Sequence, residues 1–394
     1  MRRLSRAEEA ALWRLVRRSF PLTKDRIYFN TGGLGPSPYP VLEAVEDKRR
    51  ELEQLSETGN ALHDRVRARI AGFIGAEKEE IAFTRNATEG MNFIARGIPL
   101  KQGDEVLMTT HEHPGGAMPW LAVARDKGVV IRLFEPQNDP NRMIDAVRTN
   151  ITSRTRVLMI SHVTCTLGTV FPVQDICRLA REQGVITVLD GAQAVGQIPV
   201  HVGEIGCDYY TTSGHKWLLG PKETGILYIS RQARSHFQPS FVGAYSDSGY
   251  DLDKLLLQYR NDAVVNEYGT RDAAKVWGLA AAVDFIEAIG MERVVQRLYD
   301  LADRFKARLQ EIPRVEILTP FSHASSAGIV TFRVAAMEYR EVAKILGAKY
   351  RMRVRVVGEH NINAVRVSLH IFNSEKEVDR LAEAIREISG RTSP

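Results

Sequence analysis

The chain has 394 residues, of which 44% are hydrophobic and 26% are charged, and its formal net charge is +5. This composition is that of a globular protein long enough for two or three domains, and it excludes a disordered tail, a collagen-like fibre and a disulfide-stapled miniprotein. Only three cysteines occur, which is too few for a disulfide framework and favours a reducing, cytoplasmic setting. No apolar run approaches the ~18 residues that a membrane-spanning helix needs, so we expect no association with a membrane.

Strand-like and helix-like segments alternate over the first 240 residues. Residues 1–25 predict an amphipathic helix that ends before Pro21. Short apolar runs then follow, such as EIAFT, RVLMISHV and VITVLD, separated by helical stretches that include residues 87–96, 118–127 and 173–183. This alternation predicts an α/β fold with a mostly parallel sheet. Residues 241–270, which contain several Gly, Tyr and Asp, are predicted to form a loop.

The C-terminal part has a different pattern. A long helical stretch runs from Ala273 to Glu311, is interrupted near Gly290 and ends at Pro313. The segments after it, among them GIVTFRV, AVRVSLH and EKEVDRLAEAIREI, predict a small α+β domain. We therefore expect an N-terminal helical segment (1–25), a large α/β domain (26–270), and a linking helix with a small C-terminal α+β domain (271–394).

Two strand ends in the α/β part carry residues that can perform chemistry. Asp190 ends the run VITVLD, and Lys216 follows the run CDYYTTS. Ligands of parallel α/β sheets bind beyond the carboxyl ends of the strands, so a carboxylate and an amine are expected at one binding edge. Taken alone, each has a simpler interpretation, because an aspartate there can cap the next helix and a lysine can lie in a surface loop.

Together, these two residues match what pyridoxal phosphate (PLP) needs. A lysine forms the Schiff base, and a carboxylate keeps the pyridine nitrogen protonated so that the ring accepts electrons from the substrate Cα. Ser213 and His215, which lie beside the lysine, can donate hydrogen bonds to the phosphate. The sequence therefore predicts a PLP-dependent enzyme.

The motifs DGAQAVG (190–196) and SGHKWLLGP (213–221) resemble those of the class V aminotransferase family. This family belongs to the fold-type I PLP enzymes and includes cysteine desulfurases and isopenicillin N epimerase-like proteins. The resemblance extends from YFNTGGLGPSP, near residue 28, to about residue 380. It implies a seven-stranded, mostly parallel sheet in the large domain, an amino-acid substrate, and a homodimer with shared active sites.

The resemblance also assigns roles to residues. Lys216 matches the Schiff-base lysine, Asp190 the partner of the pyridine nitrogen, and His113 the histidine that stacks on the ring; these three form the implied catalytic set. Gln193 matches the residue that hydrogen-bonds the phenolic oxygen of the ring. The implied cofactor-binding residues are Ala87, Thr88, His113, Asp190, Gln193, Ser213, His215, Lys216 and Thr270.

The resemblance implies that Ala87, Thr88 and Thr270, which lie outside the segment around Lys216, also hold the phosphate. The Ala87 backbone and the Thr88 side chain match a turn at a helix N-terminus, and NH groups at such an end form an anion site. For Thr88, a simple helix cap is the alternative. Thr270, in the segment NEYGTRDAA, matches a residue that reaches the phosphate of the neighbouring subunit.

Arg366 matches the arginine that binds the substrate α-carboxylate, a role that suits the bidentate geometry of its side chain. Asn30 and Cys165 are further candidates for substrate contacts; at the position of Cys165 the desulfurase branch usually has Asn, and a small apolar filler is the alternative role. Three more arginines, Arg351, Arg353 and Arg355, alternate along a predicted strand. We interpret them mainly as a solvated face, and contact of one of them with an acidic substrate group is the less favoured alternative.

The specific reaction is narrowed by a missing cysteine. Cysteine desulfurases carry one in the loop shortly before the carboxylate-binding arginine, and the segment VVGEHNINAVRV has none. This absence favours a β-eliminating C–S lyase or an epimerase-like enzyme acting at Cα of an L-amino acid. An aminotransferase, or a desulfurase with a non-standard thiol, are the alternatives within the family, and a non-enzymatic PLP-binding protein is the rival from another class.

The positive charge does not indicate a nucleic-acid-binding protein. Lys and Arg total 53 against 48 Asp and Glu, and the densest basic stretches, residues 14–18 and 351–355, lack interleaved aromatic residues. The excess fits an anionic cofactor and substrate better. The segment His111-Glu112-His113 is a poor match to a metal site, and we expect no metal.

Overall fold

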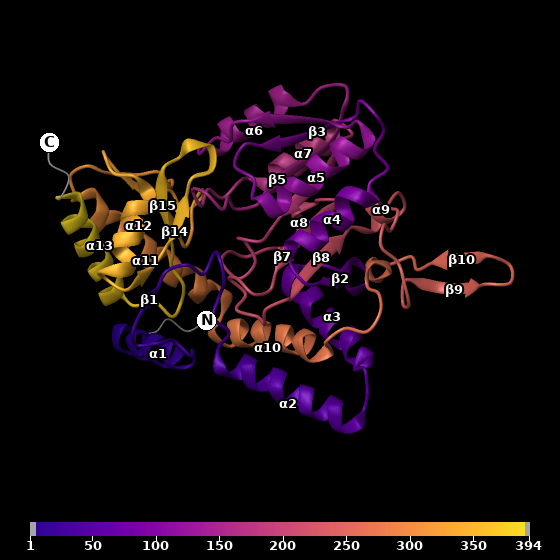
Figure 1. The fold of residues 1–394 in the computed structure, drawn as a ribbon, viewed down its shortest axis with the longest axis horizontal. Helices are drawn as coiled ribbons and strands as arrows, with labels where there is room; N and C mark the ends of the chain where they lie inside the picture. The colour runs from indigo at the N-terminus through magenta and orange to yellow at the C-terminus, as the bar shows by residue number, and fades with distance from the viewer. Residues whose placement is uncertain (1–4, 391–394) are drawn as a thin grey trace.

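A seven-stranded sheet forms the centre of the larger part of the molecule (Figure 1). The computed structural model describes residues 5–390. The strand order is β2 (Ile81–Thr84), β8 (Gly225–Ile229), β7 (Tyr209–Ser213), β6 (Ile186–Asp190), β5 (Thr155–Ser161), β3 (Glu105–Thr109) and β4 (Val130–Phe134). Every neighbouring pair is parallel except those that involve β8, which is antiparallel to both β2 and β7. The predicted mostly parallel sheet is therefore confirmed.

Both faces of this sheet are covered. In β5, Leu158 and Ile160 pack into one hydrophobic core, and Val157 and Met159 pack into another, because alternate side chains of a strand point to opposite faces. A strand that is buried on both faces has an uninterrupted apolar sequence, as RVLMISHV does. The helices of this part are α2 (Tyr39–Leu55), α3 (Asn60–Ile74), α4 (Ala87–Gly97), α5 (Pro114–Lys127), α6 (Pro140–Asn150), α7 (Val173–Glu182), α8 (Val202–Ile205) and α9 (Arg231–Arg234), and short 3₁₀ helices lie at Lys78–Glu80 and Ala263–Asn266.

Helix α5 begins four residues before the stretch predicted from the sequence. His113 is its N-cap and Pro114 its first residue. Proline is tolerated at the first helical position, because its missing N–H would have no partner there. The two glycines that follow, Gly115 and Gly116, weaken the helical pattern of the sequence. The sequence analysis therefore placed the start of this helix four residues too late.

Residues 241–270 contain a hairpin where the sequence predicts a loop. Strands β9 (Asp247–Asp251) and β10 (Leu256–Tyr259) pair only with each other, and Figure 1 shows them projecting from the molecule. Neither strand has a buried face, so the alternation of burial that marks a strand in a sequence is absent. We call residues 247–259 the arm.

The smaller, C-terminal part follows α10 (Ala273–Ile289) and α11 (Met291–Gln310), which are separated at Gly290 as predicted. Its antiparallel sheet has the order β11 (Val315–Ile317), β12 (Ile329–Val334), β15 (Ala364–Ser368) and β14 (Arg355–Val357). The remaining elements are α12 (Tyr339–Ala348), β13 (Met352–Arg353), the 3₁₀ helix η3 (Glu359–Asn361) and α13 (Glu375–Ser389).

The N-terminal residues return to this C-terminal part. Helix α1 (Arg6–Arg18) carries Arg17, which forms an ion pair with Glu377 of α13 at 2.6 Å. Strand β1 (Ile27–Tyr28) pairs with β13, and Asn30 forms a bridge with Ser368 of β15, so the chain leaves the small part after residue 30. Within residues 5–390, no helix combines the length and apolar character needed to span a membrane.

Candidate active site

A cavity of about 290 Å³ lies at the edge of the large sheet where β2, β3, β6 and β7 end. Its walls contain most of the residues that the sequence analysis brought forward. The lining residues are Gly32, Gly33, Asn86, Ala87, Thr88, His113, Gly115, Asp190, Ala192, Gln193, Ser213, His215, Lys216, Arg355 and Arg366. The predicted meeting of a lysine and a carboxylate at one binding edge is thus seen in the structure.

Lys216 follows β7 and is held by a close backbone contact. The Gly35 N–H donates to the carbonyl of His215 at 2.7 Å, and a Cβ on Gly35 would lie 2.1 Å from the carbonyl oxygen of Lys216. Only glycine therefore permits this approach. Burial lowers the pKa of the Lys216 amine, while the nearby Asp190 carboxylate acts in the opposite direction. A lowered pKa favours the neutral amine, which is the form that attacks carbonyls and accepts protons.

Asp190 is the last residue of β6, and its carboxylate is held on one side. Oδ1 accepts a hydrogen bond from the Ala192 N–H at 2.9 Å, which is the capping contact expected of an aspartate at a turn. Oδ2 lies 3.0 Å from the position that a Cβ on Gly116 would take, so glycine at that position leaves room beside the carboxylate.

The side chain of Gln193 is fixed from two directions. Its Nε2 donates to the carbonyl of Gly32 at 2.8 Å, and its Oε1 accepts from the indole N–H of Trp217 at 2.8 Å. One N–H of the amide remains for a ligand in the cavity. Trp217 is in turn held through its carbonyl, which contacts His370 Nε2 at 2.9 Å.

The N-terminus of α4 forms the end of the cavity that suits an anion. The Ala87 N–H donates to Ser213 Oγ at 3.0 Å, and Asn86 caps the helix by accepting from the Glu89 N–H. His215 Nδ1 is buried and has no hydrogen-bond partner within residues 5–390. A Cβ on Gly115 would lie 2.3 Å from Thr88 Oγ1, which shows how closely the start of α5 approaches this end. Helix-terminal NH groups, hydroxyls and an unsatisfied imidazole are suitable donors for a phosphate.

His113 lies in the cavity wall as the N-cap of α5. Its Nδ1 accepts a hydrogen bond from the Gly115 N–H at 3.0 Å, so in the neutral ring the proton is on Nε2. Burial lowers the pKa of His113, and the charge of Lys216 lowers it further. A neutral, fixed ring can stack on a flat ligand without adding charge.

Arg366 is fully buried and rigidly held. Its guanidinium donates to the carbonyl of Cys165 at 2.7 Å and to Asn30 Oδ1 at 3.1 Å. Burial lowers the pKa of Arg366 to about 9, with the nearby charge of Arg355 acting in the same direction. A desolvated guanidinium is a strong partner for a carboxylate.

Three predicted site residues do not line this cavity. Asn30 and Cys165 instead accept hydrogen bonds from the guanidinium of Arg366. Thr270 is exposed and lines a separate hollow of about 250 Å³ with Thr84, Arg85 and Glu223. Their roles toward substrate and cofactor stay predictions.

The sequence analysis gave Glu112 no role in the site and favoured a solvated face for Arg355. Glu112 is buried and accepts hydrogen bonds from Thr109 Oγ1 and Ser161 Oγ, both at 2.6 Å, and burial raises its pKa to about 7. It therefore connects the ends of β3 and β5 beneath the site. Among the described residues, no group of three His, Cys, Asp or Glu side chains could hold a metal ion. In the structure, Arg355 lines the cavity and lies opposite Arg366 in the sheet register.

A second and larger hollow, of about 750 Å³, lies on the surface between residues 21–49 and Pro221–Lys222. Its charged side chains include Arg26, Glu46 and Arg49. The residues that line it include no buried lysine beside a carboxylate, so we do not assign it as the active site although it is the larger of the two.

A buried lysine and a carboxylate at the ends of parallel strands, with an anion-binding helix terminus between them, define a site of the PLP-dependent class. The family model for Aminotransferase class-V matches residues 37–381. The chain therefore belongs to the class V aminotransferase family, and the family predicted from the sequence is confirmed.

Relatives within this family have different activities. The chain is 31% identical to a probable cysteine desulfurase of Methanothermobacter thermautotrophicus, over 95% of this chain and 98% of the relative. It is 33% identical to the isopenicillin N epimerase of Amycolatopsis lactamdurans, over 96% and 99%.

Solved structures confirm the fold. The apo cysteine desulfurase of Thermococcus onnurineus has a TM-score of 0.88 at 28% identity and is covered completely, as is this chain. The cystine C–S lyase C-DES, in complex with its product cysteine persulfide, has a TM-score of 0.86 at 26% identity, with 95% of this chain and all of that chain covered. The protein is accordingly an α/β enzyme of fold-type I that resembles desulfurases and an epimerase.

The residues of the cavity fit PLP, the cofactor of this family. The unpartnered Nδ1 of His215, Ser213 and the N-terminus of α4 would hold the phosphate. Lys216 would bind the carbonyl carbon, Asp190 the pyridine nitrogen and Gln193 the phenolic oxygen. When bound, PLP supplies an electron sink for the electron pair left at the substrate Cα.

Proposed function

We propose that the protein is a C–S lyase that eliminates a sulfur group from Cβ of an L-amino acid. The observation that carries this proposal is the absence of an accessible thiol at a cavity that Lys216, Asp190 and Arg366 all line. The three cysteines of the chain are free and buried, and none lines the cavity. Burial raises the pKa of the Cys165 thiol, and it raises that of Cys177 to about 12. A sulfur-accepting cysteine must be an exposed thiolate, whereas an eliminating lyase needs none.

In this proposal, Arg366 binds the α-carboxylate of the substrate and so orients its Cα–H bond toward Lys216. The Lys216 amine accepts the Cα proton, because burial lowers its pKa and favours the neutral form. The Cβ–S bond then breaks and the thiolate departs. Hydrolysis of the remaining fragment gives pyruvate and ammonia.

Product analysis tests the proposal. The purified, PLP-loaded protein is incubated with L-cysteine, L-cystine and thioether conjugates of L-cysteine, and pyruvate, ammonia and sulfide are measured. We expect pyruvate and ammonia in equal amounts from at least one compound. If none of the three products forms with any substrate, the protein is not a lyase.

An epimerase is the second candidate, and the 33% identity to an isopenicillin N epimerase favours it. Return of the proton to the opposite face of Cα would need no leaving group. Incubation in deuterated water distinguishes the two reactions, because an epimerase incorporates deuterium at Cα without forming pyruvate. Conversion of the substrate into an oxo acid that keeps the whole side chain would instead indicate an aminotransferase.

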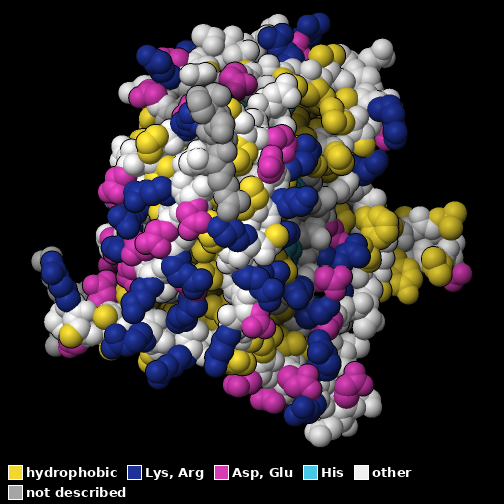
Figure 2. All heavy atoms as spheres, turned by 60° about the vertical axis from the view of Figure 1, so that its left-hand side comes forward, with side chains coloured by type: hydrophobic (Ala, Val, Ile, Leu, Met, Phe, Trp, Pro, Cys, Tyr) yellow, Lys and Arg dark blue, Asp and Glu magenta, His cyan; other side chains and the backbone are white. Residues whose placement is uncertain are grey.

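We also propose that the enzyme is a cytoplasmic homodimer with shared active sites. Thr270 is exposed and lies outside the cavity of its own subunit, which supports a role in the site of the partner. The arm carries exposed apolar side chains, among them Leu252 (77% exposed) and Leu255 (89%), and Figure 2 shows such side chains along the projection at its right. An exposed apolar patch of this kind is typical of a surface that another protein covers. Three free, buried thiols support a reducing compartment.

The double variant Leu255→Asp/Leu257→Asp should weaken the dimer, because two charges would be buried in an apolar contact. Light scattering coupled to size exclusion measures the mass, which is 44.2 kDa for one chain. We expect twice this mass for the wild type and a shift toward the single-chain mass for the variant. Asp253→Asn, at the tip of the same arm, should leave the dimer intact. A wild-type protein of single-chain mass contradicts the proposal.

A further inference from the structure

Two arginines lie side by side in the wall of the cavity. Strands β14 and β15 are antiparallel, and their register places Arg355 directly opposite Arg366. Directly opposite residues of such a pair point to the same face of the sheet, and both side chains line the cavity. Arg351 and Arg353, which alternate with Arg355 in sequence, are exposed and do not line it. Arg355 therefore does not belong to the solvated face that its alternation with Arg351 and Arg353 predicts.

The two arginines have different partners. Arg366 is held by the carbonyl of Cys165 and the side chain of Asn30. Arg355 forms an ion pair with Glu359, which begins the 3₁₀ helix after β14. The Nη1 atom of Arg355 is buried and has no hydrogen-bond partner among the described residues. Since a guanidinium carries five N–H donors, Arg355 has donors left for another acceptor.

The cavity has more cationic groups than the phosphate of the cofactor and one α-carboxylate would pair with. The phosphate of the cofactor is met by the N-terminus of α4 with Ser213 and His215, and the α-carboxylate of an amino acid is met by Arg366. Arg355 is then left with a single carboxylate, Glu359, at the cavity wall. An unpaired donor on a partly buried cation is costly, and a second anion on the ligand would remove that cost.

We propose that Arg355 forms a subsite for a second acidic group, so that the substrate is an L-amino acid whose side chain ends in a carboxylate or a similar anion. This inference rests on the proposed function and names its substrate class, which for a lyase is an acidic S-conjugate of cysteine. Glu359 is the counter-ion of Arg355 while the subsite is empty, and it faces the second acidic group when the substrate binds.

Calorimetry on the PLP-loaded protein tests the subsite with pairs of ligands that differ by one charge. The pairs are L-aspartate with L-asparagine, L-glutamate with L-glutamine, and S-carboxymethyl-L-cysteine with S-carbamoylmethyl-L-cysteine. We expect at least one acid to bind about tenfold or more tightly than its amide, as is typical when a partly buried charge gains a partner. The variant Arg355→Gln should remove this preference and leave the affinity for the amide nearly unchanged.

Three further variants separate the subsite from a structural effect. Arg353→Gln removes an exposed arginine two positions earlier and should keep the preference. Glu359→Gln should strengthen binding of the acid, because it removes a like charge beside the ligand. The double variant Arg355→Gln/Glu359→Gln deletes the ion pair as a unit, so that no charge is left unpaired, and should lose the preference as Arg355→Gln does.

The proposal is overturned if no acid is preferred, or if the preference survives in Arg355→Gln. An equal loss of affinity for acid and amide in this variant also overturns it, because Arg355 would then contact the α-carboxylate. L-Aspartate, L-glutamate and their amides have no sulfur group to eliminate, so their binding is measured without the lyase reaction. The failure of the lyase assay would leave this result standing, and the two proposals can be refuted separately.

Discussion

Replacement of Lys216 by alanine should abolish turnover and remove the aldimine absorbance of the bound cofactor. Among the described residues, Lys216 is the only lysine that lines the cavity, and the proposed function assigns to it both the covalent link to PLP and the transfer of the Cα proton. Loss of a general base alone typically costs about 10²–10⁴-fold in rate. Steady-state kinetics with the best substrate and an absorbance spectrum of the purified protein measure both effects.

Lys222→Ala is the matched control for this variant. Lys222 lies six positions later, is exposed and does not line the cavity, so its removal should leave the rate and the spectrum unchanged. The residues expected to hold the phosphate do not include Lys216, and Lys216→Ala should therefore still bind PLP without a covalent link. A Lys216→Ala variant that still showed the aldimine absorbance would place the Schiff base on another lysine.

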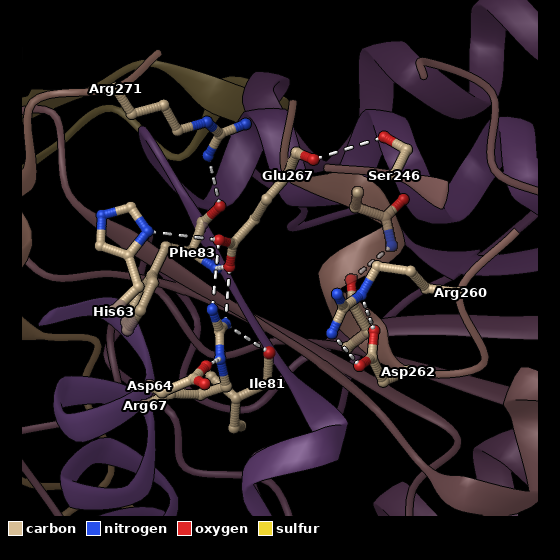
Figure 3. Close-up of polar contacts among 12 residues, drawn as sticks. His63, Asp64, Arg67, Ile81, Phe83, Ser246, Arg260, Asp262, Glu267 and Arg271 are labelled. Carbon is tan, nitrogen blue, oxygen red and sulfur yellow. Dashed lines mark hydrogen bonds and ion pairs between the residues drawn. The ribbon is translucent and has the colours of Figure 1, made fainter. Parts of the chain in front are cut away.

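Replacement of Glu267 by alanine should destabilise the fold by about 3–5 kcal/mol, the cost of removing one partner of a buried ion pair. Figure 3 shows the carboxylate of Glu267 between Arg67 of α3, the Phe83 N–H of β2 and His63. Arg67 and Glu267 are only 3% and 5% exposed, so alanine would leave a buried guanidinium without its carboxylate. Urea unfolding, followed by circular dichroism, measures the change in the free energy of unfolding.

An exposed ion pair provides the control. Glu316→Ala breaks the pair with Arg333 at the surface, and such pairs contribute about 0–1 kcal/mol. If Glu267→Ala lowered the free energy of unfolding as little as Glu316→Ala, the buried ion pair of Glu267 with Arg67 would not stabilise the fold as described.

The stability from Glu267 should also depend on pH in a defined direction. Burial by itself would raise the pKa of Glu267, but hydrogen bonds and charge from His63 and Arg67 outweigh it and lower the pKa to about 2 from 4.5. A carboxyl group with a lowered folded-state pKa stabilises the fold fully above its unfolded pKa and loses this effect as the pH falls toward the folded value. The difference in stability between the wild type and Glu267→Gln should therefore shrink between about pH 4.5 and pH 2.

The position of Asp190 and Lys216 at one edge of the sheet was predictable because the strands that precede them are buried. The run VITVLD can only be an interior strand, so Asp190 had to lie at its carboxyl end, and the same holds for Lys216 after β7. The arm was not predictable, because β9 and β10 have no buried face. Arg355 was assigned mainly to a solvated face because its role depends on which residue of β15 it faces, and the alternation of the three arginines does not give that register.

The most direct test of the PLP assignment is to locate the lysine that binds the cofactor. The PLP-loaded protein is reduced with borohydride, which makes the link between lysine and cofactor permanent, and is then digested and analysed by mass spectrometry. The structure predicts the phosphopyridoxyl group on Lys216 alone. A label on another lysine, or a protein that takes up no label after incubation with PLP, would contradict the site described above.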